Sequence, residues 1–407
     1  MPDAYVDMPL FDWSRATVTH ETVARTPSGV TVLAPPAPRY RYLLTDLLTG
    51  KVISDGRGLS VQSYSRRICN QGEATATFAV SDAVLRNADD PIAATEPRRT
   101  ALWIIRNEIP VYGGIIWTRT YTSDTAVLNL GLSTFESYWA RRRIRATLSY
   151  TQQDQNQILY RLATDAQSKP YGNIGATLVS PGNSGILRDR YYYWHERATY
   201  LERMQQLCGV INGPDFTFDP YWKSPGVPGV SLRIGTPIGA RLPTVVEYPG
   251  EVRNYSWPDD GGDSANFWTA IGEAPSTPDN APPIMRDASM PSEWAAGVPL
   301  LEDVSEHQGV TDVNTLAGYA QANVLAASGN RVVPSVTLRL GPDALLPGIG
   351  DSLTVRVSDP YRFPPNPFTN GPGAIATLRV TGWTVNVSQG EGETLTVTSG
   401  DDVKDDS

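Results

Sequence analysis

Hydrophobic and polar positions alternate along two parts of the chain, and this period of two is typical of β-strands with one buried face. In the first part, residues 40–149, the run ATATFAVSD alternates Ala74, Ala76, Phe78 and Val80 with Thr75, Thr77 and Ala79. Turn residues such as Thr49–Gly50 and Asn107–Glu108 separate the runs. The pattern predicts a meander of short antiparallel strands, large enough for a small barrel or sandwich.

The second alternating part covers residues 331–400. Its expected inward positions are Val336, Leu338, Leu340, Leu353, Val355, Val357, Leu378, Val380, Trp383, Val385, Val387, Leu395 and Val397. The inward register changes between Val380 and Trp383, around Gly382, as a β-bulge requires. We therefore expect a second barrel-like β unit here.

Between these parts, residues 150–255 mix helical and strand patterns, which predicts a small α+β domain. Thr151 to Asp154 fits a capping box before the helically spaced set Ile158, Leu159, Leu162, Ala163 and Ala166. A second helix is expected from about His195 to Cys208, with Gly209 as its end. The runs DFTFDPYW and GVSLRIG predict a hairpin around KSPGVPG.

The remaining segments carry weaker patterns. Residues 256–330 are rich in loop signals, apart from one amphipathic helix with Val313, Leu316, Ala320 and Val324 on its apolar stripe. Residues 1–39 predict an extended N-terminal arm, because Pro35, Pro36 and Pro38 disfavour a sheet interior. Residues 401–407 predict an acidic tail. The fold class expected is mainly β: two small antiparallel β-barrel-like domains flanking an α+β region.

Composition narrows the function. The 407 residues carry 34 Lys+Arg against 43 Asp+Glu, a formal charge of −9, which disfavours a dedicated, sequence-specific nucleic-acid binder. No apolar run approaches the ~18 residues of a membrane span. The acidic start before Arg15 is wrong for a secretory signal peptide, so synthesis in the host cytoplasm is expected. Only four basic residues are Lys, and the Arg excess indicates GC-rich coding or arginine-rich interfaces.

Residues with catalytic chemistry form no recognisable motif. His20, His195 and His307 stand alone, and the two cysteines, Cys69 and Cys208, have no metal-ligand spacing. Ser184 lies in a GNSG stretch without the spacing of a nucleophile elbow. Carboxylates that could serve glycoside hydrolysis are present but cannot be paired from sequence: Glu136, Glu196, Asp215, Asp219 and Glu247. We therefore expect no catalytic, cofactor or metal site.

Two clusters are candidates for contact with a partner. The first is the basic run Arg141, Arg142, Arg143 and Arg145. One interpretation is contact with phosphate or nucleic acid, and the alternative is a solvated strand or an intersubunit patch. The second is the aromatic cluster Tyr191, Tyr192 and Trp194. One interpretation is a platform for sugar stacking, and the alternative is the apolar anchor of the following helix or an interface. In both clusters the structural or intersubunit interpretation is favoured.

Several runs resemble a known family. YRYLLTDLLTGKVISD, LSVQSYSRRICNQGEATATFAVSD and TALWIIRNEIPVYGGIIWTRTY, followed by LNLGLSTFESYWARRRI, resemble the opening of minor tail proteins of siphophages that infect actinobacteria. These proteins are similar to the tail-tip, or baseplate, hub family. DVNTLAGYAQANVLAAS and PSVTLRLGPDALLPGIGDSLTVRV extend the resemblance to the closing part of the chain.

The resemblance implies a structural role as a homotrimer. Each chain would supply two barrel domains to a ring that joins the six-fold tail tube to the three-fold tip. The implied partners are distal tail and tail-tube proteins, the tape measure protein, and tip or receptor-binding proteins. The implied place is the distal end of the virion tail, where the hub closes and opens the channel for DNA ejection. Two rival hypotheses are a tail-associated cell-wall or polysaccharide hydrolase and a carbohydrate-binding adhesin.

Overall fold

The computed structural model describes residues 38–80, 90–210, 212–273, 283–307, 310, 312–330, 334–368, 371–388 and 392–399. The expected acidic tail and almost all of the expected N-terminal arm lie outside these residues. The chain divides into two compact units. Unit 1 comprises residues 1–255 and 335–400, and unit 2 comprises residues 256–334 and 401–407.

The strands of the first β region of unit 1 are antiparallel, as its alternation predicts, but only β5–β6–β7 form a meander, because β1 pairs with β5 and β4 pairs with β7. Its strands are β1 (Tyr40–Asp46), β2 (Val52–Ser54), β3 (Leu59–Arg67), β4 (Glu73–Ala79), β5 (Thr100–Arg106), β6 (Ile109–Thr122) and β7 (Val127–Thr134), with short helices α2 (Pro91–Ala94) and α3 (Glu136–Trp139). Ala74, Ala76 and Phe78 of β4 are buried. Asn107 and Glu108 have φ of 48° and 64°, and they form the β5–β6 turn.

The second β region contains β13 (Arg241–Tyr248), β14 (Val252–Ser256), β18 (Ser335–Arg339), β19 (Ser352–Val357), β20 (Ala374–Ser388) and β21 (Gly392–Ser399). All of the expected inward residues except Val387, which is half-buried, belong to the buried core. The β20–β21 register shifts between Val380 and Gly382, which confirms the expected bulge.

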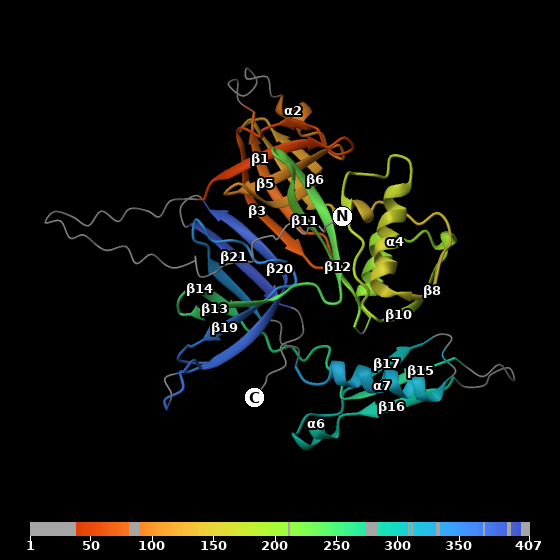
Figure 1. The fold of residues 1–407 in the computed structure, drawn as a ribbon. Coiled ribbons are helices and arrows are strands. Elements are labelled where there is room, and N and C mark those ends of the chain that lie inside the picture. The colour runs from red at the N-terminus through yellow and green to blue at the C-terminus, as the bar shows by residue number, and fades with distance from the viewer. Residues whose placement is uncertain are drawn as a thin grey trace, which may run out of the picture. The chain divides into compact units, whose positions relative to one another are not determined.

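The two β regions are hydrogen-bonded to each other. Within the described residues, thirteen strands are linked in one sheet, because β20 pairs with β3 from Gly382–Arg67 to Asn386–Ser63. Figure 1 shows the strands of the second region next to those of the first. The mainly β fold class is confirmed, and the junction between β3 and β20 makes one framework of segments more than 300 residues apart.

The α+β part of unit 1 contains β8 (Leu148–Asp154), α4 (Gln155–Ser168), β9 (Thr177–Leu178), β10 (Leu187–Tyr192), a 3₁₀ turn (Trp194–Glu196), α5 (Tyr200–Cys208), β11 (Asp215–Ser224) and β12 (Val227–Gly235). The expected hairpin is confirmed as β11–β12. The expected inward residues of α4 are all buried, and they share one core with Trp103, Phe135 and Trp139 of the first β region. Among the described helices, none is long and apolar enough to cross a membrane.

Both helices of this part begin later than the sequence pattern predicts. The expected capping box at Thr151 is wrong, because residues 148–154 form β8 by pairing with β10. Asp154 caps α4 instead, and its Oδ1 accepts a hydrogen bond of 2.9 Å from the Asn156 N–H. The α5 helix begins at Tyr200 rather than near His195, with a capping box formed by Thr199 and Glu202.

The cap of α4 gives a direct test of this correction. Asp154 Oδ2 also accepts hydrogen bonds from Ser184 Oγ and the Gly185 N–H. We expect Asp154→Ala to lower the free energy of unfolding by about 1–2 kcal/mol, because three hydrogen bonds lose their acceptor. Thr151→Ala is the matched control and is expected to change it by less than about 0.5 kcal/mol. Urea denaturation measures both, and equal effects would contradict the assignment.

Unit 2 is more regular than its sequence indicates. It contains β15 (Phe267–Ile271), β16 (Met285–Ser289), α6 (Pro291–Ala295), β17 (Glu302–Glu306) and α7 (Val313–Ala327). The expected amphipathic helix is confirmed as α7, with Leu316, Ala320 and Val324 fully buried. The expectation of loops around residues 256–300 is wrong, because β15 pairs with both β16 and β17. The sequence pattern did not predict these strands, because charged residues occupy several positions of β16 and β17.

Candidate interaction surface

The basic run follows α3, and two of its arginines lie against half-buried aromatic rings of the same chain. The guanidinium of Arg141 lies 5.4 Å from the centre of the Trp117 ring. The guanidinium of Arg142 lies 5.4 Å from the centre of the Tyr138 ring and donates a hydrogen bond of 2.8 Å to its hydroxyl. Two of the four candidate arginines are thus held against unit 1 by cation–π contacts. Arg143 and Arg145 are exposed.

The aromatic cluster divides between core and surface. Tyr192, at the end of β10, is only 4% exposed and belongs to the core, so it cannot contact a partner in this fold. Tyr191 and Trp194 are 52% and 49% exposed, and Tyr193 between them is 45% exposed. The Tyr191 hydroxyl is 3.2 Å from Thr151 Oγ1 on the neighbouring strand.

The structure brings the two candidate clusters together. Arg143 pairs with Thr199 as an isolated β-bridge, and the Ile144 N–H donates to the carbonyl oxygen of Ala198 at 3.1 Å. The Arg143 guanidinium donates to the carbonyl oxygen of Arg197, whose own guanidinium lies 5.1 Å from the centre of the Trp194 ring. We call Arg143, Tyr193, Trp194 and Arg197 the arginine–aromatic surface. The sequence identifies two of its members, Arg143 and Trp194, as candidates. It does not indicate that residues about 50 positions apart lie next to each other.

The carboxylates considered for hydrolysis are each engaged in polar contacts. Asp215 pairs with Arg379, Glu196 with Arg203, and Glu247 with Arg356. Asp219 pairs with Arg66 and Arg233, whereas Glu136 Oε1 accepts a hydrogen bond from the Phe218 N–H. These contacts are those of structural ion pairs and caps.

Other residues with catalytic potential are similarly placed in structural contacts. The His195 ring stacks on Tyr193 and the His307 ring stacks on Tyr319, with centroid separations of 5.4 and 4.2 Å. Ser184 donates to Asp154, and both cysteines carry free thiols. Over the described residues, no three His, Cys, Asp or Glu side chains are grouped to hold a metal ion.

A cleft of about 600 Å³ opens in unit 1 between the β1–β2 turn and the β11–β12 hairpin. Trp103, Phe135 and Val230 form apolar parts of its lining, and Asp46 and Lys223 are its ionisable residues. Asp46 already accepts hydrogen bonds from the Thr49 N–H and hydroxyl, which keep its pKa below the usual value. Asp46 is therefore engaged in a local contact of the β1–β2 turn.

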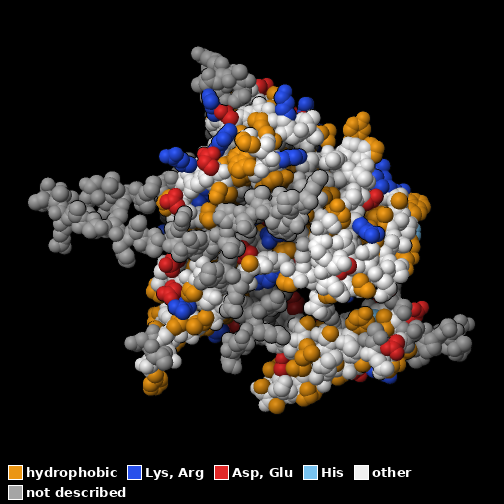
Figure 2. Space-filling model, in the orientation of Figure 1, with side chains coloured by type: hydrophobic (Ala, Val, Ile, Leu, Met, Phe, Trp, Pro, Cys, Tyr) orange, Lys and Arg blue, Asp and Glu red, His pale blue; other side chains and the backbone are white. Residues whose placement is uncertain are grey.

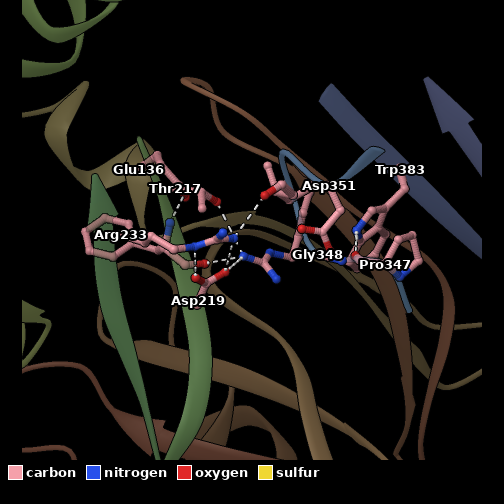
Figure 3. Close-up of polar contacts among 11 residues, drawn as sticks. Glu136, Thr217, Asp219, Arg233, Pro347, Gly348, Asp351 and Trp383 are labelled. Carbon is pink, nitrogen blue, oxygen red and sulfur yellow. Dashed lines mark hydrogen bonds and ion pairs between the residues drawn. The ribbon is translucent and has the colours of Figure 1, made fainter. Parts of the chain in front are cut away.

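A partly buried polar cluster fastens the first β region to β11 and β12 (Figure 3). Arg66 contacts Asp219 Oδ1 at 2.5 Å, and Arg233 contacts Asp219 Oδ2 at 2.6 Å. Burial opposes ionisation of Asp219, but the positive charges of Arg66 and Arg233 outweigh it and hold the pKa of this carboxyl below its usual value. Arg233 also donates to the carbonyl oxygen of Ile349. The ionised Asp219 thus links three separate segments.

The loop before β19 is held on the other side of this cluster. Asp351 Oδ2 accepts a hydrogen bond of 2.9 Å from the Gly348 N–H, and its Oδ1 accepts one from the Ala240 N–H. The Trp383 indole donates to the carbonyl oxygen of Pro347 at 3.0 Å, as Figure 3 shows. The sequence PGIGD is therefore the expected turn into a strand, fixed by its own aspartate.

Glu136 contributes a buried carboxyl group with one oxygen unpartnered. Its side chain is fully enclosed, and Oε2 has no hydrogen-bond partner. Burial raises the pKa of Glu136 above its usual value, although hydrogen bonds to its oxygens partly oppose this. The folded state therefore holds the proton of this carboxyl more tightly than the unfolded chain does.

Substitution of this carboxyl should change the pH dependence of stability. Because the folded-state pKa is raised, Glu136 favours folding most below the unfolded pKa, and this contribution falls as pH rises through the folded pKa. We expect Glu136→Gln to flatten this dependence and to be at least as stable as the original chain at pH 8. Thermal unfolding between pH 4 and 8 measures it. A parallel pH profile in both proteins would contradict the assignment.

A second buried ion pair joins the two β regions directly. Arg106 on β5 and Glu393 on β21 are 2.7 Å apart, with side chains 3% and 4% exposed. Arg106 also donates to the carbonyl oxygens of Gly341 and Ala344, and the Tyr40 hydroxyl donates to Glu393. Every strong donor and acceptor of the pair thus faces a partner, which is the condition for a tolerable buried charge.

Comparison with known proteins identifies the fold. No protein-family model matches the chain, and no curated protein matches its sequence. The structure is similar to the 43 kDa tail protein of prophage MuSo2 from Shewanella oneidensis, with a TM-score of 0.54 and 11% identity, over 89% of this chain and 98% of that one. A tail protein from Neisseria meningitidis has a TM-score of 0.53 and 11% identity, over 89% and 97% of the two chains.

A third similar structure is the prophage tail protein gp18 from Listeria monocytogenes, with a TM-score of 0.53 and 10% identity, over 89% of this chain and 95% of that one. All three neighbours are phage-type tail proteins, and the chain spans nearly their full length. The protein therefore has the fold of phage tail proteins, although at these identities the similarity extends to the fold alone.

Proposed function

We propose that the protein is a structural hub at the distal tip of a phage tail. The observation that carries this proposal is the nearly complete overlap with three tail proteins, each covered over at least 95% of its length. The sequence resemblance to minor tail proteins of siphophages infecting actinobacteria supports the same role and this type of host.

In this role the two β regions act as the two hub domains of each chain. A homotrimer then presents six such domains in a ring below the tail tube, in contact with the tape measure protein and with tip or receptor-binding proteins. The shared sheet and the buried pair Arg106–Glu393 support this role, because they fasten the two β regions into one framework. Such a ring closes the channel and opens it for DNA ejection after contact with the host.

The proposed role is non-enzymatic. It is supported by the ion pairs and hydrogen bonds that engage the candidate carboxylates Glu136, Asp215 and Asp219. Zymography of the purified chain on host cell walls should therefore give no cleared band. Cleavage that survives replacement of the exposed Glu247 but is lost with Asp219→Asn would favour the hydrolase instead.

Mass spectrometry of purified source virions tests the proposal as a whole. A hub is present in every particle, in a fixed and low copy number relative to the tail-tube protein. We expect peptides from both β regions in gradient-purified particles, with constant abundance across preparations. Their absence from infectious virions would overturn the proposal.

A further inference from the structure

The net negative charge of the chain is concentrated in unit 2. Residues 256–334 contain eleven Asp and Glu but only two Arg, so this stretch alone carries a formal charge of −9, equal to that of the whole chain. Among its described residues Arg286 is the single cation. The negative charge of the protein is thus a local property of unit 2, which creates a surface potential able to attract a cationic partner.

One face of the unit 2 sheet combines this charge with exposed apolar groups. Helix α7 covers the face that contains Ala270 and Ala288. Alternation and register place on the opposite face the apolar side chains Phe267, Ile271, Met285 and Val304 and the acidic side chains Asp287, Glu302 and Glu306. We call this set the acidic apolar face. Met285 and Val304 are 45% and 53% exposed.

Two strands that contribute to this face are edge strands of the sheet. Strands β16 and β17 are the two edges of the sheet, and Glu302 and Glu306 lie on β17. Figure 2 shows hydrophobic side chains mixed with Asp and Glu on the surface of unit 2. An apolar centre with charged neighbours is typical of a protein interface.

The arginine–aromatic surface of unit 1 has the complementary chemistry. Tyr, Trp and Arg are the residues most enriched at the centres of protein interfaces. Nearby acidic groups are already engaged: Glu196 pairs with Arg203, and Glu202 caps α5. Within the described residues, neither Arg143 nor Arg197 forms an ion pair, so both retain charge for a partner.

We propose that the arginine–aromatic surface of one copy binds the acidic apolar face of a second copy. One polypeptide carries both complementary surfaces, so the contact is head-to-tail. Such contacts close into rings when the rotation between copies permits it. The inference rests on the proposed hub function, because it supplies the contact that would hold neighbouring hub chains together.

Sedimentation equilibrium of the full chain tests the contact. We expect reversible association that weakens about tenfold or more between 50 and 500 mM salt, since the charged groups are exposed. Arg143→Glu combined with Arg197→Glu should raise the dissociation constant by about 100-fold, because it places like charges opposite each other. The pair Arg41→Glu and Arg98→Glu is the matched control, with the same charge change at exposed sites of unit 1 away from the arginine–aromatic surface, and should have little effect.

Charge reversal on both surfaces separates a specific contact from general electrostatics. Adding Glu302→Arg and Glu306→Arg to the Arg143→Glu, Arg197→Glu chain should restore association to within about tenfold of the original. A chain that stays monomeric at all concentrations, an association unaffected by the arginine changes, or the absence of rescue would each overturn the contact. Circular dichroism confirms that each variant is folded.

The test also distinguishes other uses of the same surface. If Trp194→Ala abolishes binding of isolated host cell-wall glycans but leaves the oligomeric mass unchanged, the surface is a receptor site and the proposed contact is wrong. Failure of the contact leaves the hub function standing wherever the protein is found in virions. Absence from virions defeats the hub function even if the isolated chain associates by this contact.

Discussion

Arg106→Met is expected to lower the free energy of unfolding of unit 1 by about 3–5 kcal/mol, the largest effect among the single substitutions considered. The change leaves Glu393 buried at 4% exposure without its cation, and it removes the donors to the Gly341 and Ala344 carbonyl oxygens. Guanidinium denaturation followed by tryptophan fluorescence measures the change, since Trp103 and Trp383 are both buried in unit 1.

The double variant Arg106→Met, Glu393→Leu is the control for this prediction. It removes both charges together, so no unpaired carboxylate stays buried, and we expect it to recover much of the lost stability. Arg106→Met within about 1 kcal/mol of the original chain would contradict the view that this pair fastens the two β regions.

Asp219→Ala is expected to lower the free energy of unfolding by about 2–3 kcal/mol, because Arg66 and Arg233 lose their shared counter-charge in a partly buried site where the Arg66 side chain is 10% exposed. The folded-state pKa of Asp219 lies below its usual value, so its contribution is present above the unfolded pKa and is lost as pH falls through the folded pKa. The difference between the two proteins should therefore be largest near neutral pH and shrink in acid.

The exposed pair Glu247–Arg356 provides the matched comparison for Asp219. Its side chains are 53% and 45% exposed, and exposed pairs contribute little to stability. We expect Glu247→Ala to change the free energy of unfolding by less than about 0.5 kcal/mol. Equal losses for Asp219→Ala and Glu247→Ala would show that the partly buried cluster has no special role.

Local sequence patterns were sufficient to predict the buried faces of most strands in the two β regions of unit 1. The inward residues of the second β region are almost all buried, and the bulge lies at Gly382 as expected, because period-two burial is a local property of each strand. The same alternation did not predict the strands of unit 2. Strand β17 reads Glu-Asp-Val-Ser-Glu, and four of its five residues are exposed, so no alternation of apolar and polar residues marks it as a strand.

The long-range contacts could not be predicted from one sequence. Arg106 and Glu393 are 287 positions apart, and neither residue is distinctive in its own strand. The arginine run and Trp194 were both noticed, but their meeting depends on the pairing of Arg143 with Thr199. Tyr192 is buried and Tyr191 is exposed because neighbouring residues of β10 point to opposite faces. Three consecutive tyrosines do not indicate which of them points inward.

Immunogold labelling of intact source virions with antibody against this chain tests the central claim most directly. We expect gold at the distal end of the tail, where the tube meets the tip, and none on the capsid. Labelling confined to the capsid, or no labelling of virions whose tail-tube protein labels well, would contradict the hub function.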